Sequence, residues 1–217
     1  MSSWSHVRSS YDQVAGKYED RFRDELAGKE GDRHLLATLA QSVADPVLEI
    51  GCGPGQIGGF VRERGRRVLG LDLSPEMARR AAARLDGALV ADMRDLPIRS
   101  GGIGGIVAFY SIIHLRRPEL RDTFREFFRA LRPGGRILLS AHEGDDEIEL
   151  TEFIGEPVPM AATFFGLDEL TTALGAAGFD ITNAVRREPY SSEGSTIRLY
   201  VEACKPESDP DGQTTES

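Results

Sequence analysis

The sequence is poor in cysteine and has no long apolar run. Only two of its 217 residues are cysteine, Cys52 and Cys204, so we expect neither a disulfide framework nor a metal site, and we expect a reducing cytoplasm. The longest uncharged stretch, residues 101–115, is glycine-rich and shorter than the ~18 apolar residues of a membrane span. Residues 1–10 lack the apolar core of a signal peptide. We therefore expect neither a membrane span nor export.

Positive charge is also in deficit. Lys and Arg number 26 against 35 Asp and Glu, which gives a formal charge of −9. Such a field repels polyanions, so nucleic acid is disfavoured as a partner and a small-molecule substrate is expected. Four arginines lie close together at residues 62–67; a solvated helix end explains them, with an anion site as the alternative. The length and the hydrophobic fraction of 40% fit one globular domain.

The most distinctive segment is VLEIGCGPG, from Val47 to Gly55. Four strand-like residues run into a loop with glycine at every second position, and glycine can take positive φ and let a ligand touch the backbone. A second strand pattern ends at Asp72, near the ~20-residue offset at which an acid meets ribose hydroxyls in nucleotide-binding α/β folds. Together these features predict an adenosine-containing cofactor.

The spacing of the glycines indicates which cofactor. Dinucleotide loops read G-x-G-x-x-G, and here only Gly58 could complete a loosely shifted version, so NAD is disfavoured. Four blocks, VLEIGCGPG, LGLDLSPEM, VADMRDLPI and ALRPGGRILLS, occur in this order. From about Tyr11 to Lys205 the chain resembles the class I S-adenosylmethionine (SAM)-dependent methyltransferases, especially small-molecule enzymes related to those of ubiquinone and menaquinone biosynthesis.

Strand and helix patterns alternate through the middle of the chain. Strands are expected at 47–50, 68–71, 88–91, 103–109 and 136–140. Their order predicts an α/β fold with a Rossmann-like, doubly wound and mostly parallel sheet. The runs at 88–91 and 103–109 are continuously apolar, which predicts burial on both faces. Further strands at 179–185 and 196–203 would, by the resemblance, complete seven strands with an antiparallel edge.

Helix signals are clearest at two places. Ser74-Pro75-Glu76 is a capped helix start, and we expect that helix to reach about Leu85. A helix from Arg117 should end at residues 133–135, Pro-Gly-Gly. Further helices are expected at 11–22, around 35–43 and at 168–177.

The chain is expected to divide into four parts. Residues 1–205 form one methyltransferase domain, in which 1–45 are a helical lid, 46–141 the cofactor-binding core, and 142–205 a substrate-side segment with the final strands. Residues 143–165 begin with an acidic run and show no periodicity, so we expect an irregular segment that selects the acceptor together with His114. Residues 206–217 are too polar to order themselves.

The resemblance also assigns the cofactor contacts. The glycine loop approaches the methionyl and ribose groups, Glu49 organises that loop, and Asp72 accepts from the ribose diol. For the adenine amino group Asp92 is preferred over Asp95. Tyr11 and Tyr18 lie in the segment YDQVAGKY, and the resemblance implies that this segment is a lid over the cofactor. An equally good interpretation is a row of helix side chains that packs against the domain. The expected cofactor-binding residues are Tyr11, Tyr18, Glu49, Gly51, Cys52, Gly53, Gly55, Asp72, Leu73, Met77, Asp92, Met93 and Tyr110.

Catalytic residues are harder to identify from the sequence. Methyl transfer is an in-line displacement that depends mainly on alignment in a dry pocket, so a base is not required. His114 and His142 are the candidates for a general base, since each follows a strand end. A SAM-binding protein without transfer activity is the alternative function, and core packing is an equal explanation for Met77.

Overall fold

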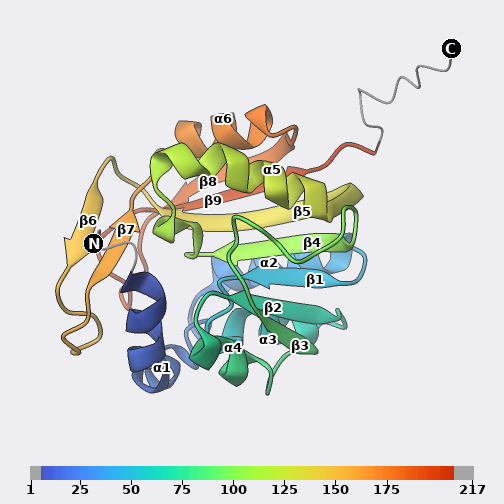
Figure 1. Ribbon diagram of the computed structural model, residues 1–217. Coiled ribbons are helices and arrows are strands. Elements are labelled where there is room, and N and C mark those ends of the chain that lie inside the picture. The colour runs from blue at the N-terminus through green and yellow to red at the C-terminus, as the bar shows by residue number, and fades with distance from the viewer. Residues whose placement is uncertain (1–5, 208–217) are drawn as a thin grey trace, which may run out of the picture.

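The computed structural model describes residues 6–207. Seven strands form one sheet in the order β3-β2-β1-β4-β5-β9-β8 (Figure 1). The strands of this sheet are β1 (Val47–Ile50), β2 (Val68–Asp72), β3 (Gly87–Val90), β4 (Ile103–Phe109), β5 (Leu131–His142), β8 (Asp180–Arg187) and β9 (Arg198–Cys204). The first five are parallel, whereas β9 is antiparallel to β5 and to β8. The predicted fold class is confirmed, with the antiparallel strand one place in from the β8 edge.

Helices cover both faces of the sheet. The six helices among the described residues are α1 (Val7–Phe22), α2 (Glu30–Ser42), α3 (Gln56–Arg62), α4 (Pro75–Ala81), α5 (Leu120–Ala130) and α6 (Leu167–Ala176). One apolar core joins the sheet to α5 and α6, and a second joins it to α2 and α3. Figure 1 shows α5 and α6 together on one side of the sheet and α1 apart from both layers. None of the described helices is long and apolar enough to cross a membrane.

The local sequence explains where the helices begin and end. The Ser74 hydroxyl accepts from the Met77 amide at 3.1 Å, and Pro75 occupies the first turn, so the capped start of α4 is confirmed. The helix ends at Ala81, short of the expected Leu85, and its last residues continue as turns. The two 3₁₀ turns after β4, Ile112–His114 and Arg117–Glu119, lead into α5.

The Pro-Gly-Gly segment does not end a helix as predicted. The preceding helix, α5, stops at Ala130, and β5 already begins at Leu131. Gly134 donates its amide to the Lys205 carbonyl at 2.9 Å, which holds the segment beside the end of β9. The helix pattern therefore ends one turn earlier, and the strand begins earlier than 136.

The prediction that the third strand is buried on both faces was wrong. In the structure β3 is the last strand on its side of the sheet, and Val90 is 53% exposed. By contrast, β4 lies in the centre and every residue of it is buried. Both runs are apolar, so their composition alone did not separate an edge strand from a central one.

Residues 143–165 are more regular than expected. They contain a two-stranded antiparallel hairpin of β6 (Glu147–Leu150) and β7 (Met160–Thr163). The four residues of β7 are all buried, whereas β6 is largely exposed. β6 reads Glu-Ile-Glu-Leu and alternates over only four residues, and β7 reads Met-Ala-Ala-Thr and does not alternate, so the periodic signal is short. The hairpin lies beside α1 in Figure 1.

The α5 contact with the sheet should account for much of the stability. Phe127 is fully buried in the core that joins α5 to the sheet. We expect Phe127→Ala to lower the free energy of unfolding by about 3–5 kcal/mol, because the substitution removes buried ring surface and leaves a cavity. Urea denaturation measures this loss. The control is Ile181→Ala on β8, where the side chain is 37% exposed and the change should stay below about 1 kcal/mol; equal losses would contradict the assignment.

Candidate functional site

The glycine loop between β1 and α3 requires its glycines. Gly51, Gly53 and Gly55 have φ of 62°, 51° and 83°, in the left-handed region. A Cβ added at Gly51 would lie 2.4 Å from the Cβ of Ser111, so no larger residue fits there. The loop is thereby held against the chain that follows β4, as a binding loop requires.

Asp72 ties this loop to the start of α4. Its Oδ2 accepts from the Gly53 amide and its Oδ1 from the Ser74 amide, both at 2.8 Å. The residue is 8% exposed. Burial raises the pKa of Asp72 to about 6, although the two amide donors pull it down. The carboxylate is therefore positioned and still has acceptor capacity for a ligand.

Glu49 stands behind the loop rather than in it. It is 3% exposed, and its Oε2 accepts from the Gly58 amide at 3.0 Å. A Cβ at Gly58 would lie 2.3 Å from that oxygen. Gly58, considered in the sequence only as part of a dinucleotide pattern, thus makes room for Glu49. Burial raises the pKa of Glu49 well above its usual value.

Two adjoining cavities lie at the carboxyl ends of β1, β2 and β4 and beside the residues that follow β3. The first, of about 90 Å³, is lined by Val7, Arg8, Tyr11, Tyr18, Gly51, Gly53, Asp72, Leu73, Ser74, Met93, Phe109, Tyr110, Ser111 and His114. The second, of about 260 Å³, is lined by Val7, Gly51, Leu71, Leu73, Ala91, Asp92, Met93, Arg94, His114, Leu115, Arg116 and Glu119. Several residues line both, so the two form one continuous candidate site, at the sheet end where ligands bind in α/β folds.

Helix α1 closes the first cavity from outside. Asp12 accepts from the Ser74 hydroxyl at 2.5 Å and from the Glu76 amide at 3.2 Å, and Glu19 pairs with Arg84 at 2.7 Å. On the other side, Ser10 donates to the Pro159 carbonyl at 2.5 Å, just before β7. The helix therefore spans the site from α4 to the β6–β7 hairpin.

The two tyrosines of α1 occupy the space beneath it. Tyr11 and Tyr18 lie edge to face with ring centroids 5.8 Å apart, and both line the first cavity. Burial raises the pKa of each phenol. The cavity volume of about 90 Å³ is below the roughly 300 Å³ at which ligand pockets begin, because these side chains fill it. The two rings thus occupy part of the space that a cofactor-sized ligand would need on this side of the site.

His114 is held in one tautomer. Its Nδ1 lies 2.9 Å from the Ala161 carbonyl, which can only accept, so the proton is on Nδ1. Its Nε2 therefore accepts from the Tyr11 hydroxyl at 2.8 Å. Burial lowers the pKa of His114 to about 4, so the ring is neutral at neutral pH. The structure brings His114 to the candidate site with its unprotonated Nε2 directed at Tyr11 of α1.

His142 takes a different position. It lines neither cavity, its Nδ1 lies 2.8 Å from the Thr196 hydroxyl, and its ring packs 5.1 Å from that of Tyr110. Burial, with the charge of Arg198 adding to it, lowers the pKa of His142 to about 4. His142 therefore lies behind Tyr110, which lines the first cavity.

Asp92 lines the second cavity, as expected of the adenine-side acid, whereas Asp95 lines neither. The Asp92 carboxylate already accepts from the Arg94 guanidinium, with Nη2 at 2.6 Å and Nε at 3.0 Å. Burial raises the pKa of Asp92, but the Arg94 contacts outweigh this and leave it lowered. The Asp92 carboxylate is thus ionised, and a ligand that donates to it would have to bind beside the Arg94 guanidinium.

Most, but not all, of the expected cofactor residues reach the two cavities. Those that line neither are Glu49, Cys52, Gly55 and Met77. Cys52 and Met77 are buried, which agrees with the core-packing reading of Met77. Val7 and Arg8, which were not predicted from the sequence, also line the site. Only the proximity of Val7 and Arg8 to YDQVAGKY could have indicated them.

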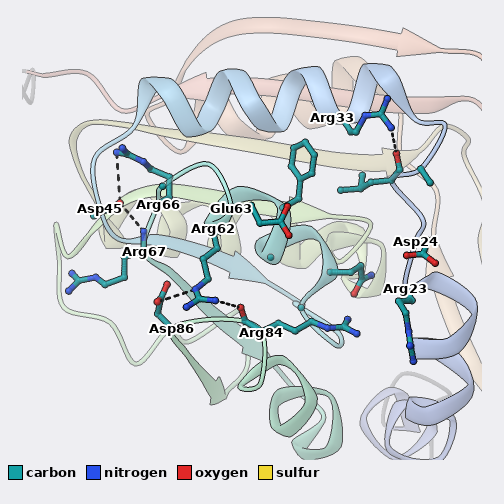
Figure 2. Close-up of a pocket in the computed structure, with 17 residues that line it drawn as sticks. Arg23, Asp24, Arg33, Asp45, Arg62, Glu63, Arg66, Arg67, Arg84 and Asp86 are labelled. Carbon is teal, nitrogen blue, oxygen red and sulfur yellow. Dashed lines mark hydrogen bonds and ion pairs between the residues drawn. The ribbon is translucent and has the colours of Figure 1, made fainter.

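A larger hollow, of about 990 Å³, lies elsewhere (Figure 2). It contains the arginines of residues 62–67 that face it, together with Arg23, Arg33 and Arg84. Most of them are engaged: Arg62 pairs with Asp86 at 3.2 Å, and Arg33 donates to the Leu26 carbonyl at 3.0 Å. Parts of its wall immediately precede β1, β2 and β3, the amino ends of the strands, so it is not the expected ligand end. The solvated reading of this arginine cluster fits these pairs.

Comparison with known proteins agrees with this geometry. A family model described as a methyltransferase domain matches residues 47–135. An uncharacterized methyltransferase of Geobacillus kaustophilus is 31% identical over 60% of this chain and 61% of its own length. A malonyl-[acyl-carrier protein] O-methyltransferase of Serratia marcescens is 31% identical over 88% of this chain and 75% of its own length.

Solved structures share the fold. The 1,6-didemethyltoxoflavin-N1-methyltransferase of Burkholderia thailandensis matches with a TM-score of 0.68 and 23% identity over 92% of this chain and 87% of that one. The magnesium protoporphyrin IX methyltransferase of Synechocystis matches with a TM-score of 0.71 and 15% identity over 94% and 98%. The chain therefore belongs to the class I SAM-dependent methyltransferase family, as its four sequence blocks predicted.

The raised pKa of Asp72 predicts a pH-dependent site. A ribose diol needs the ionised carboxylate as an acceptor, so affinity for S-adenosylhomocysteine (SAH), the product implied by the resemblance, should fall by about tenfold from pH 7 to pH 5 as Asp72 is protonated near pH 6. Titration calorimetry at several pH values measures this. Asp72→Asn should bind more weakly and lose the dependence; an unchanged pH profile in that variant would assign the effect to another group, with Glu49 the first to examine.

Proposed function

We propose that this protein binds SAM and transfers its methyl group to a small-molecule acceptor. The observation that carries the proposal is that the glycine loop and the Asp72 carboxylate line one cavity that continues to Asp92 and Met93. An acceptor for ribose, a backbone cradle and an acid on the adenine side thus occur in one continuous site. The Geobacillus relatives align over only about three fifths of their own length, so activity and acceptor are proposals for this chain.

The lining residues fit the chemically different parts of SAM. Asp72 would accept from the ribose diol, and the loop at Gly51 and Gly53 has no Cβ to block the methionyl group. Leu73 is 39% exposed, an apolar surface suited to one face of adenine. The Met93 amide and the Asp92 carboxylate would meet the edge of the base. The rings of Tyr11 and Tyr18 suit a sulfonium, since cations are attracted to aromatic faces.

The acceptor side is proposed at the lid and the β6–β7 hairpin. The ring centroid of Phe153 lies 5.9 Å from that of Tyr11, and the ring centroid of Phe164 lies 5.6 Å from that of His142. Both phenylalanines therefore add aromatic surface beside the tyrosines of α1 and His142. Phe165, the next residue, is instead fully buried in the main core. With a formal charge of −9, a small and partly apolar acceptor is favoured over nucleic acid, and the two free thiols suit a reducing cytoplasm.

His114 is the proposed general base where the acceptor must lose a proton. It is neutral, its Nε2 lone pair is available once Tyr11 withdraws, and the Ala161 carbonyl keeps the proton on the other nitrogen. His142, behind Tyr110, is proposed only as a secondary candidate. Alignment in a water-poor pocket supplies the remaining rate acceleration.

Calorimetry with SAM, SAH and NAD tests the cofactor assignment. We expect heat with SAM and SAH, a rise in the unfolding temperature by mass action, and no effect of NAD. Incubation with cell-extract fractions and methyl-labelled SAM should then release SAH and label one fraction. Binding without labelling in any fraction would favour a SAM-binding protein without transfer activity, and the absence of binding would refute the proposal.

The position of α1 predicts a cofactor-dependent lid. SAH should slow hydrogen exchange in residues 7–22, because the helix must open to admit the ligand and closes again on it. The contacts of Asp12, Glu19 and Ser10 should re-form in that state. Hydrogen exchange with mass spectrometry, with and without SAH, measures this. Identical exchange would identify α1 as a permanently packed helix, and residues in α6 serve as an internal control.

A further inference from the structure

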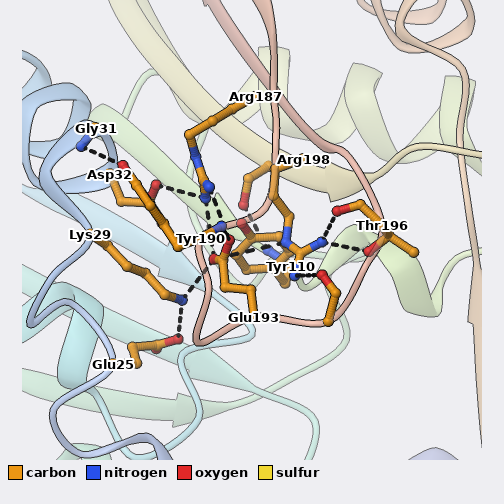
Figure 3. Close-up of polar contacts among 12 residues, drawn as sticks. Glu25, Lys29, Gly31, Asp32, Tyr110, Arg187, Tyr190, Glu193, Thr196 and Arg198 are labelled. Atoms are coloured by element: carbon orange, nitrogen blue, oxygen red, sulfur yellow. Dashed lines mark hydrogen bonds and ion pairs between the residues drawn. The ribbon is translucent and has the colours of Figure 1, made fainter.

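A chain of buried and part-buried polar groups runs from Tyr110, which lines the first cavity, through the β8–β9 loop to the segment before α2 (Figure 3). It joins the residue after β4, the first turn of α2, the end of β8, β9, and the β8–β9 loop. We refer to it as the buried polar network, and its members are Glu25, Lys29, Asp32, Tyr110, Arg187, Glu193 and Tyr200. Of these residues only Tyr110 lines either cavity of the candidate site.

The direction of each hydrogen bond at Tyr200 is fixed by its partners. The Asp32 carboxylate, which only accepts, lies 2.7 Å from the Tyr200 hydroxyl, and the Arg187 Nη2, which only donates, also lies at 2.7 Å. Tyr200 therefore gives its single proton to Asp32. The Tyr110 hydroxyl, 3.1 Å away, must then donate to Tyr200. The Tyr110 hydroxyl is therefore held in place by the hydrogen bond that it donates to Tyr200, and its oxygen can still accept a hydrogen bond.

The charges of the network support one another. Asp32 is 1% exposed, and Arg187 reaches it at 3.2 Å while pairing with Glu193 at 2.9 Å. Burial raises the pKa of Glu193, but hydrogen bonds from Arg187 and the Tyr190 amide, with the charge of Lys29, lower it to about 2. A buried charge that loses its partner is strongly unfavourable, so each member fixes the next.

Both ends of the network meet the cofactor-binding loops. At one end Tyr110 has φ of 50°. This backbone conformation costs energy for a residue other than glycine, and it persists only where the surrounding structure imposes it. At the other end Lys29 pairs with Glu25 at 3.5 Å, and Glu25 accepts from Gln56 at 2.6 Å. Gln56 directly follows Gly55 of the glycine loop.

We propose that Asp32, Arg187 and Tyr200 are positioning residues that hold Tyr110 against the cofactor, so that the β8–β9 loop, remote in sequence, sets cofactor affinity. The proposal rests on the proposed function, since it requires that SAH binds at the cavity that Tyr110 lines. It gives a role to residues 188–197, which contact no part of that cavity. No direct contact between Tyr200 and the cofactor is involved.

A double-mutant cycle with SAH as the probe tests it. Tyr200→Phe removes only the hydroxyl and should weaken SAH binding by about threefold to tenfold, the range expected for one hydrogen bond. Tyr110→Phe should do the same or more. If Tyr200 acts through Tyr110, the double variant should bind no more weakly than Tyr110→Phe alone. Calorimetry below the unfolding temperature of each variant measures the affinities.

The control is Glu202→Gln, also on β9, where the side chain pairs with Asn183 at the surface at 2.9 Å. It should leave SAH affinity unchanged. Tyr200→Phe affinity within twofold of the wild type, or additive losses in the double variant, would overturn the proposal. Absence of SAH binding to the wild-type protein would instead refute the proposed function, and this inference with it.

A measurement on the wild-type protein covers the case in which Tyr200→Phe does not fold. SAH should slow hydrogen exchange in residues 188–197 and at the start of α2, although neither segment contacts the cavity. Asp32→Asn, which keeps an acceptor for Tyr200 and removes only the charge, should weaken SAH binding in the same direction. Unchanged exchange in the β8–β9 loop would show that the network does not couple to the site.

Discussion

The carboxylate of Asp72 is the interaction on which the site depends, because one side chain joins two loops. Its oxygens receive the Gly53 amide from the loop after β1 and the Ser74 amide at the start of α4. Parallel pairing of β1 with β2 places both strand ends at the same edge, so the bridge needs no further adjustment of the backbone. Ser74 then receives α1, since its hydroxyl donates to Asp12. The glycine loop, the start of α4 and helix α1 are thus assembled around one acid.

The sequence predicted this centre well, for a physical reason. Positive φ at three alternate residues strongly favours glycine, and β2 is an apolar run that ends in an acid, so Gly51, Gly53 and Asp72 are recognisable in one dimension. The strands β1 and β4 were predicted with their observed bounds because β1 is mainly apolar between Pro46 and Gly51, and β4 is an uncharged run that begins after Gly102.

The parts that the sequence did not predict depend on tertiary contacts. The edge position of β3 follows from sheet order, and the pairing of β6 with β7 bridges a connection with no periodic signal. The bond from Asp12 to Ser74 joins residues 62 positions apart, and that from Tyr200 to Asp32 joins residues 168 apart. No local pattern marks such pairs. Val7 and Arg8 were missed for the same reason, since their place in the site depends on how α1 packs.

The buried acids also relate the stability of the fold to its ligand. A carboxyl whose pKa rises on folding favours the fold while it is protonated, and this contribution is lost as pH rises through the folded-state pKa. For Asp72, raised from 3.8 to about 6, the loss above that pH is on the order of 3 kcal/mol. Glu49 shifts in the same direction. The fold therefore keeps two acids in unfavourable surroundings at neutral pH, and hydrogen bonds from a ribose diol to Asp72 would offset part of that cost. Stability and any binding of a ribose diol would therefore be linked at the same carboxylate, which the amides of Gly53 and Ser74 hold in place.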